Sequence, residues 1–322
     1  MRILLSLFVL SFPLAVSCGV HAQSYPSRPI TVLVPYQAGG GPEVMLRTVL
    51  QAITDSTGTK FVVENKPGGA GVAAAMEAKQ AAPDGYTLFW CDQGTFAANV
   101  ALLKNLPYAP LKDFTPILKI IEGDMLLVTP ASLGAKSVAD LATMAKQKPG
   151  GLTYASQGVG TGGHFGGAML ANAIGVDMVH VPYKSGGSSA RPDLLAGRVD
   201  FMFNTPASFL QDINAGTLAA LAVASKQRSS KLPNVPTMTE SGYPSVEMHV
   251  WFGIAAPAGL DNRIAAQIRD LFTQALKTPK VQQALNVQAF RFRETSSLEM
   301  AREIDAQIDT FKAVVKASNI SL

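Results

Sequence analysis

The sequence predicts an α/β protein with two lobes, each built on a mixed, mainly parallel sheet flanked by helices. Apolar, strand-like runs alternate with stretches at helical spacing along nearly the whole chain. This alternation begins again near Met125, after a first βαβαβ set. The 322 residues also exceed the ~150 residues of a typical single domain. Together these observations favour two lobes over one.

The first lobe follows from its strand and turn signals. Continuous apolar strands flanked by helices are typical of a sheet covered on both faces, with right-handed crossovers. Pro83-Asp84-Gly85 marks the turn before the third strand, because proline presets φ and glycine frees the exit. We expect strands over 30–34, 61–64 and 86–90, and helices over 43–54 and from the Gly-rich stretch 67–71 to about 81.

The second lobe repeats the same alternation from Met125 onward. Ser137 has the side chain preferred at a helix N-cap, which sets the start of the first helix of this lobe. We expect strands over 126–128, 152–155, 178–181, 199–203 and 219–224, and helices over 138–146, 165–174, 188–196 and 207–215.

The C-terminal part adds one strand, over 251–255, and three helices, near 261–276, 279–286 and 297–317. These helices have no sheet of their own, so we expect them to pack on the first lobe. Residues 23–123 and 247–322 would then form lobe 1 and residues 124–246 lobe 2. Two chain crossings between the lobes would act as a hinge.

Residues 1–22 have the features of a cleavable secretory signal. Arg2 precedes an apolar run to Val16, and Val20-His21-Ala22 supplies small residues at a cut site. The run is shorter than the ~20 residues of a membrane helix. The sequence therefore predicts a soluble mature protein outside the cytoplasm. The alternative is a lipoprotein at Cys18, although Ala15-Val16-Ser17 lacks the leucine that is usual three residues upstream.

Charge and cysteine content restrict the function further. Removal of residues 1–22 takes Arg2 from the 27 basic residues and nothing from the 23 acidic ones, which leaves a net charge of +3. This mild charge, without clustered Lys or Arg, argues against nucleic-acid binding. Cys91 is then the one remaining cysteine, so no intramolecular disulfide can form. We expect a monomer stabilised by its core.

Three strand-to-helix junctions carry most of the chemical information: 38–42, 92–95 and 156–164. In α/β sheets such loops lie at the carboxyl ends of strands, where ligands bind, and a helix N-terminus there offers unpaired N–H groups to an anion. Each glycine loop taken alone can also be just a tight turn. Three loops at equivalent positions in both lobes favour a shared cleft for an anion.

Other chemistry has weaker support. Residues 158–163 fit the dinucleotide pattern G-x-G-x-x-G, but the acidic residue expected ~20 residues later is missing. No phosphate-binding G-x-x-x-x-G-K-[ST] occurs. Ser156 does not lie in a G-x-S-x-G motif, because Tyr154 occupies the position of the first glycine. We therefore expect no cofactor and no catalytic residue.

The three histidines beyond the signal form no recognisable zinc motif, so we expect no metal site. His164 follows the third glycine loop and is expected to cap or line the cleft. His180 lies between Val179 and Val181 in the pattern of a buried strand, which favours a structural role.

Six motifs appear in an order that matches a known family: Pro35-Tyr36-Gln37-Ala38-Gly39-Gly40, Val63-Glu64-Asn65-Lys66-Pro67-Gly68, Pro83-Asp84-Gly85-Tyr86-Thr87-Leu88, His180-Val181-Pro182-Tyr183-Lys184, Leu232-Pro233-Asn234-Val235-Pro236-Thr237, and Trp251-Phe252-Gly253 with Ala256-Pro257-Ala258-Gly259. On these residues the chain closely resembles the Bug-type solute receptors of tripartite tricarboxylate transporters, over essentially all of its length after the signal.

The resemblance implies a class II periplasmic binding-protein fold that closes on a small carboxylate-bearing solute and delivers it to a membrane permease. In the family, main-chain groups and bridging waters of the first-lobe loops and the second-lobe glycine loop hold the carboxylate. The corresponding residues here are Tyr36, Ala38, Gly39, Gly40, Gln93, Gly94 and Thr95 from the first lobe, and Ser156, Gly160, Thr161 and His164 from the second.

Four positions depart from the family pattern. Asp92 stands where a small hydroxyl residue is expected, Asn204 where an aspartate is expected, Glu43 in place of an aspartate and Ala168 in place of a glutamate. We include Asp92 and Asn204 among the ligand-binding residues. Asp92 either pairs with an ammonium group of the solute or simply caps the helix that begins near Thr95.

Two other functions stay open from sequence alone. One is an exported α/β enzyme that acts on a small acid. The other is a receptor whose closed form signals to a membrane sensor kinase instead of delivering solute to a permease.

Overall fold

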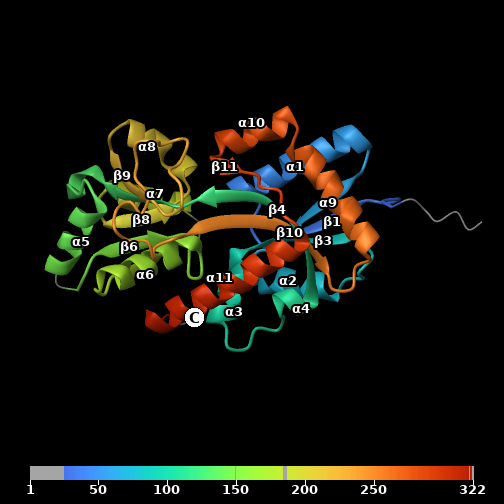
Figure 1. Ribbon diagram of the computed structural model, residues 1–322, viewed down its shortest axis with the longest axis horizontal. Coiled ribbons are helices and arrows are strands. Elements are labelled where there is room, and N and C mark those ends of the chain that lie inside the picture. Colours follow the sequence, from blue (N-terminus) through green and yellow to red (C-terminus); the bar gives the residue numbers. More distant parts are fainter. Residues whose placement is uncertain (1–24, 149, 184–186, 319, 321–322) are drawn as a thin grey trace, which may run out of the picture.

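The two sheets of the protein lie one after the other along its long axis, and helices cover both (Figure 1). The computed structural model describes residues 25–148, 150–183, 187–318 and 320. The predicted signal sequence, with Cys18, and Lys184 of the fourth motif lie outside the described residues. Within these residues, no helix combines the length and apolar character required to cross a membrane.

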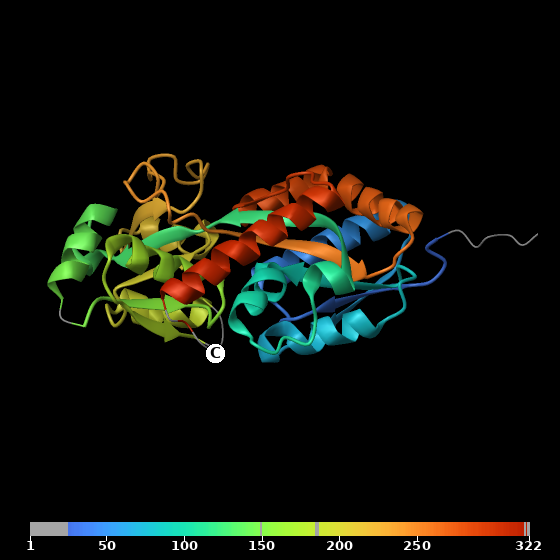
Figure 2. The same cartoon turned by 60° about the horizontal axis from the view of Figure 1, so that its bottom comes forward.

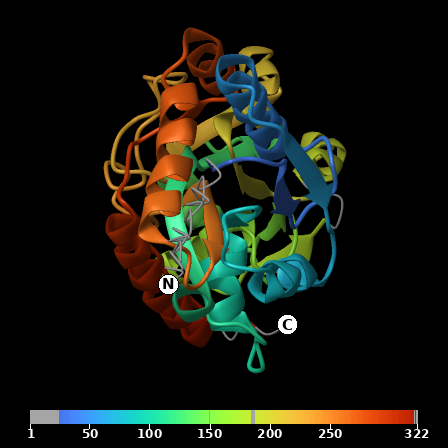
Figure 3. The ribbon, with the colours of Figure 1, turned by 90° about the vertical axis from the view of Figure 1, so that its right-hand side faces the viewer.

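The first sheet has six strands in the order β11-β4-β10-β3-β1-β2. Its strands are β1 Ile30–Val34, β2 Phe61–Asn65, β3 Thr87–Asp92, β4 Phe114–Asp124, β10 His249–Pro257 and β11 Phe290–Arg291. The helices around it are α1 Gly41–Thr57, α2 Val72–Gln80, α3 Asn99–Leu102, α4 Pro110–Asp113, α9 Asn262–Leu276, α10 Pro279–Val287 and α11 Ser297–Ala317, with a π-helical turn, η2, over Gly94–Ala98. Viewed along the long axis, α1 (blue), α2 (cyan), α9 (orange) and α11 (red) surround the strands (Figure 3).

The second sheet has five strands in the order β7-β6-β8-β5-β9. Its strands are β5 Leu126–Pro130, β6 Thr153–Ser156, β7 Val179–Pro182, β8 Phe201–Asn204 and β9 Leu218–Val223, and its helices are α5 Val138–Gln147, α6 Gly162–Ile174, α7 Gly187–Leu195 and α8 Leu210–Asn214. As expected, Ser137 caps α5, because its side chain accepts a hydrogen bond from Asp140 N.

Both sheets are mixed, as the sequence predicts. The parallel neighbours are β1 with β2 and β3, and β6 with β7 and β8. The other five neighbouring pairs are antiparallel. The expected α/β elements are found close to their predicted bounds, but parallel pairs do not outnumber antiparallel ones.

The expectation that His180 lies in a buried strand is wrong in one respect. Its strand, β7, is an edge strand of the second sheet, and Val179 is 51% exposed. An edge strand leaves part of its length open to solvent, so the apolar residues next to His180 in the sequence do not indicate that the strand is buried.

Strand β4 is the main element that the sequence pattern misses. It lies between β10 and β11, and its chain continues through Met125 alone into β5 of the other sheet. Strand β10 runs antiparallel beside it, with His249 opposite Asp124. These two strands therefore connect the sheets at adjacent positions, the two chain crossings at which the sequence predicts a hinge.

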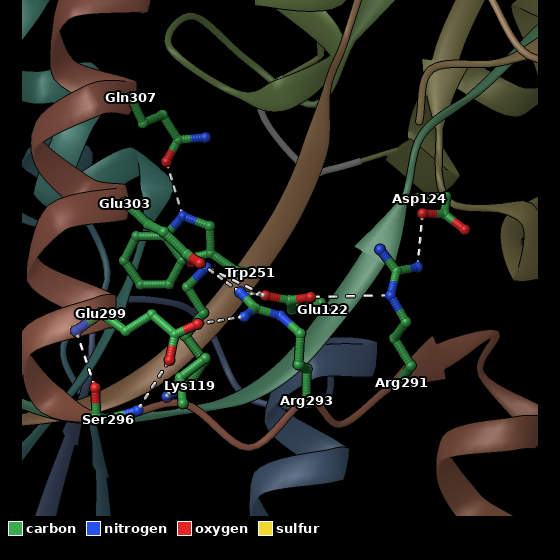
Figure 4. A network of polar contacts seen from close by, with 11 residues as sticks. Lys119, Glu122, Asp124, Trp251, Arg291, Arg293, Ser296, Glu299, Glu303 and Gln307 are labelled. Carbon is green, nitrogen blue, oxygen red and sulfur yellow. Dashed lines mark hydrogen bonds and ion pairs between the residues drawn. The ribbon is translucent and has the colours of Figure 1, made fainter. Parts of the chain in front are cut away.

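A buried ion network fixes this part of β4 (Figure 4). Lys119 is only 2% exposed, and its ammonium donates to Glu122 Oε1 at 3.1 Å and to Glu303 of α11. Arg293 bonds Glu122 and Glu303 at 3.3 and 2.6 Å. Burial alone would raise the pKa of Glu122, but the charges of Lys119 and Arg293 outweigh it and hold the pKa below its ordinary value.

The C-terminal helices cover the first sheet, and α11 also reaches the second. Helices α9 and α10 pack on α1, while α11 packs along β4. Figure 2 shows α11 (red) running diagonally from one lobe to the other. At its far end the ring of Phe311 stacks on Phe165 of α6 with centroids 4.0 Å apart, and Asn172 donates to Ser318 Oγ at 2.8 Å. Helix α11 therefore joins both sheets.

Candidate functional site

The loop after β1 places Tyr36, Ala38, Gly39 and Gly40 at an exposed helix start. Helix α1 begins at Gly41, and the buried side chain of Glu43 folds back so that its Oε2 accepts from Gly39 N at 3.0 Å. The Gly39 amide is therefore already used inside the protein. The N–H groups of Gly40 and Gly41 have no partner among the described residues. They remain as donors at the positive end of the α1 dipole.

The loop after β3 is organised around Asp92. Its Oδ1 accepts from Thr95 N at 2.8 Å and from Thr95 Oγ1 at 2.7 Å, while the Tyr36 hydroxyl donates to Oδ2. Burial raises the pKa of Asp92 to about 6, although the bonds from Thr95 act in the opposite direction. Both carboxylate oxygens are engaged within the protein. This geometry favours the capping interpretation over pairing with a solute ammonium.

The chain after Asp92 enters the π-helical turn η2, in which Gly94 is half-buried and Thr95 is buried. Single π-helical turns are frequent at functional sites. Gln93, just before this turn, is 5% exposed, and its Oε1 has no hydrogen-bond partner in the described part of the chain. A buried amide oxygen without a hydrogen-bond donor destabilises the folded protein. A bound solute that supplies a donor would remove this penalty.

The loop between β6 and α6 contains the second-lobe residues. Ser156 is fully buried, and its hydroxyl contacts His180 Nε2 at 2.7 Å. Gly160 N donates to His164 Nδ1 at 3.1 Å, and Thr161 Oγ1 donates to Gly158 O at 2.7 Å. Several donors expected to be free are therefore used to shape the loop.

Free donors nevertheless remain at the start of α6. The N–H groups of Gly162 and His164 have no partner among the residues that the structure describes, whereas Gly163 N donates to Gln157 Oε1. Asn204, at the end of β8, accepts from Thr205 N at 2.8 Å. It follows Phe203, whose carbonyl accepts from Gln157 Nε2, so Asn204 lies beside this loop.

The loops of the two sheets meet. A methyl group placed on Gly162 would lie 2.9 Å from Gln93 Nε2, and one placed on Gly160 would lie 3.0 Å from Leu102 Cδ1 of α3. The end of β3 and the end of α3 thus touch the glycine loop of the other lobe. The α1 start joins this group through Tyr36, which bonds Asp92.

The sequence analysis missed three contributors to this arrangement: Glu43 as the acceptor for Gly39 N, Leu102 as a contact of Gly160, and His180 as the partner of Ser156. A glutamate at the third position of a helix is a known signal for a bond back to the chain before the helix. Nothing in the sequence places Leu102 beside Gly160, because that contact depends on the angle between the lobes.

A cavity of about 880 Å³ lies elsewhere. It is lined by the ion network around Lys119 and Glu122, by α11 and by residues 225–231, and it includes none of the predicted ligand-binding residues. Within the described residues, no group of three or more His, Cys, Asp or Glu side chains could hold a metal ion.

The chain is similar to several known proteins. The family profile described as "Tripartite tricarboxylate transporter family receptor" matches residues 45–320. The chain belongs to this receptor family. BugT of Bordetella pertussis is 32% identical to this receptor over 274 residues, which are 85% of this chain and 84% of that protein. A UPF0065 protein of Pseudomonas sp. strain P51 is 34% identical over 263 residues, 81% of this chain and 78% of that protein.

Several solved structures are similar as well. An R. palustris protein solved with adipate has a TM-score of 0.82 and 30% identity, and the match covers 92% of this receptor and 99% of that chain. MatC of Rhodopseudomonas palustris, with bound malate, has a TM-score of 0.80 and 29% identity, over 90% of this receptor and all of that chain. The periplasmic binding protein BugD has a TM-score of 0.79 and 29% identity, over 92% and 99%.

Proposed function

We propose that this receptor captures a small carboxylate-bearing molecule between the loops that follow β1 and β3 and the loop that precedes α6. The observation that carries the proposal is the meeting of Gln93 with Gly162 across the lobes. It brings residues of both sheets to the N-terminus of one thirteen-residue helix, α6.

Helix N-termini supply the electrostatics that a carboxylate needs. Unpaired N–H groups remain at Gly40 and Gly41 of α1 and at Gly162 and His164 of α6, among the described residues. Each end also carries the positive pole of a helix dipole, worth ~0.3–1 kcal/mol for a nearby anion at an exposed site. Two such ends in different lobes would make binding of an anion favour the closed form.

The relatives support the chemical class. One R. palustris relative was solved with adipate and MatC with malate, so two structures at 30% and 29% identity hold dicarboxylates. We infer a carboxylate-bearing solute here as well: an organic acid, amino acid or aromatic acid with at least one carboxylate. Gln93 would contribute an amide donor, and a hydroxyl or other donor on the solute would satisfy its unpaired Oε1.

The wider role follows from the family. We propose that the receptor acts in the periplasm after cleavage of residues 1–22, works as a monomer, and passes its solute unchanged to a membrane permease of a tripartite transporter. It has no catalytic role in this proposal, because the Ser156 hydroxyl beside His180 is fully buried and donates to Gly158 O, so it is not directed at a substrate. Similarity to BugD, described as a periplasmic binding protein, supports the location.

Mass spectrometry of solute released from the purified receptor tests the proposal most simply. We expect a small carboxylic acid, recovered chemically unchanged. Titration with adipate, malate and citrate should then raise the melting temperature. A bound solute adds RT ln(1 + [L]/Kd) to the free energy of unfolding, which is about 2.7 kcal/mol at 100 times Kd. Dimethyl adipate, which lacks the charges, is the control and should give no shift. Conversion of the solute would contradict the proposal and favour an enzyme.

A further inference from the structure

The glycine loop before α6 rests on two histidines that face each other. The rings of His164 and His180 are stacked, with centroids 3.9 Å apart and an interplanar angle of 9°. The ring of Tyr154, on β6, stacks on His180 at 5.0 Å. His164 comes from α6 and His180 from β7, so the stack ties the helix to the edge strand of the sheet.

Each imidazole bonds the loop through one named nitrogen. His164 Nδ1 accepts from Gly160 N at 3.1 Å, and His180 Nε2 contacts Ser156 Oγ at 2.7 Å. Ser156 Oγ also accepts from Gly158 N at 3.0 Å and donates to Gly158 O at 2.9 Å. Because the serine has one proton, all three of its contacts are satisfied together only when His180 carries its proton on Nε2.

The hydrogen bonds therefore fix both tautomers. His164 must keep Nδ1 unprotonated to accept from Gly160, so its proton lies on Nε2, and His180 is also an Nε2–H imidazole. A proton added to His164 Nδ1 would turn this nitrogen into a donor, so it could no longer accept the hydrogen bond from Gly160 N. Two stacked imidazolium ions 3.9 Å apart would also repel each other.

The loop held in this way is the one that meets the first lobe. Gly160 has a φ of +81°, and a methyl group on it would lie 3.0 Å from Leu102 Cδ1. A shift of Gly160 would therefore move the contact between the lobes. His164 itself is only 4% exposed, so it acts from beneath the loop.

We propose that the neutral His164–His180 stack is a positioning pair, which holds Gly158 and Gly160 so that the loop before α6 can close on the solute. This role rests on the proposed function and replaces direct contact of the His164 side chain with the solute. The pair also makes closure sensitive to acid, because a proton on His164 Nδ1 removes the acceptor for Gly160 N, and two charged rings at this distance would repel each other.

The surroundings of the pair agree with this sensitivity. Burial, and for His164 also the neighbouring His180, lowers the pKa of both imidazoles to about 4. The titratable group that faces them from β6 is the Tyr154 phenol, whose pKa burial raises. Among the described residues, no acidic or basic side chain other than the partner imidazole contributes to either shift.

Two measurements test the pair without a solute. Long-range ¹H–¹⁵N NMR spectra of histidine-labelled receptor should show Nε2–H tautomers for His164 and His180 at pH 7, with both titrating well below pH 6.5. His164→Leu should speed hydrogen exchange of the Gly160 amide at least about tenfold, whereas His164→Asn, whose Oδ1 lies near the Nδ1 position, should stay within about threefold of wild type. An Nδ1–H tautomer at His164, or unchanged Gly160 exchange in His164→Leu, would overturn the proposal.

A solute measurement separates this inference from the proposed function. With adipate as the probe at pH 7.5, His164→Leu and His180→Leu should weaken binding by roughly tenfold or more, while His164→Asn and His180→Gln should retain most of it. Equal loss in the Leu and the conservative variants would contradict a positioning role. If wild type binds neither adipate nor any other carboxylate, the proposed function fails, whereas the tautomer and exchange results still decide the role of the histidines.

Discussion

The side-chain amide of Gln93, at the end of β3, lies directly against the backbone of Gly162, at the start of α6. A methyl group on Gly162 would be 2.9 Å from Gln93 Nε2. Glycine at this position lets a residue of the first sheet approach the helix N-terminus of the second. The same Gln93 has a buried Oε1 without a partner in the described part of the chain. A binding role would explain why this unfavourable group is present.

Gln93→Leu should separate stability from binding. The substitution removes the unpaired Oε1, so we expect the free energy of unfolding without solute to rise by about 1 kcal/mol. It also removes the amide donor, so solute affinity should fall at least about tenfold, which corresponds to about 1.4 kcal/mol. Urea unfolding and thermal-shift titration measure the two effects on the same samples.

Gln157→Leu is the matched control for Gln93→Leu. Both ends of the Gln157 amide are paired, with Gly163 N and with Phe203 O. Its loss should therefore lower the free energy of unfolding by about 2 kcal/mol. Destabilisation of both variants to the same extent would show that Gln93 is an ordinary structural residue.

Asp92→Asn tests the capping interpretation through pH. Burial raises the pKa of Asp92 to about 6 from about 3.9 in unfolded chains. Between these values the folded state binds more protons, so this group makes wild type less stable as the pH rises from about 4 to 6. The asparagine variant lacks this loss and keeps an acceptor for Thr95 N. We therefore expect it to be more stable than wild type by about 1–3 kcal/mol at pH 7 and equal near pH 4.

The same variant decides whether Asp92 recognises an amine. If Asp92 only caps η2 and bonds Tyr36, Asp92→Asn should leave the preference between amine-bearing and amine-free acids unchanged. Asp92→Ala, which removes the cap, should cost about 1 kcal/mol of stability. A selective loss of amine-bearing solutes in the asparagine variant would restore the ammonium-pairing hypothesis.

Lys119→Met should be strongly destabilising. It leaves Glu122, which is 5% exposed, without its buried ammonium partner, so we expect a loss of about 3 kcal/mol or more in urea unfolding. Lys79→Met is the control, because the Lys79–Asp113 pair lies nearer the surface and should cost less than about 1 kcal/mol. Similar small losses in both variants would mean that the network around Lys119 does not secure β4.

Most of the fold could be predicted from apolar periodicity, whereas β4 could not. Its residues include Pro116, Lys119, Glu122 and Asp124, which interrupt the apolar run. The three charged groups among them are buried because Arg291, Arg293 and Glu303 neutralise them from positions far along the chain. A local pattern contains no information about such distant partners, and it also cannot reveal that β10 inserts between β3 and β4.

The loops that form the candidate site could be predicted from the sequence, but their free N–H groups could not. The glycine junctions after β1, β3 and β6 lie at strand ends as expected, and their contact across the lobes is visible at Gln93 and Gly162. The sequence could not say which N–H groups stay free, because Glu43, Asp92 and His164 occupy some of them through side-chain geometry.

The most direct test is a crystal structure of the receptor with the carboxylate that co-purifies or binds it most tightly. We predict that the carboxylate oxygens lie within hydrogen-bond distance of N–H groups from both sheets, at Gly40 or Gly41 and at Gly162 or His164, with the lobes closed around them. A solute held by one lobe alone, or bound in the cavity beside residues 225–231, would contradict the proposed site.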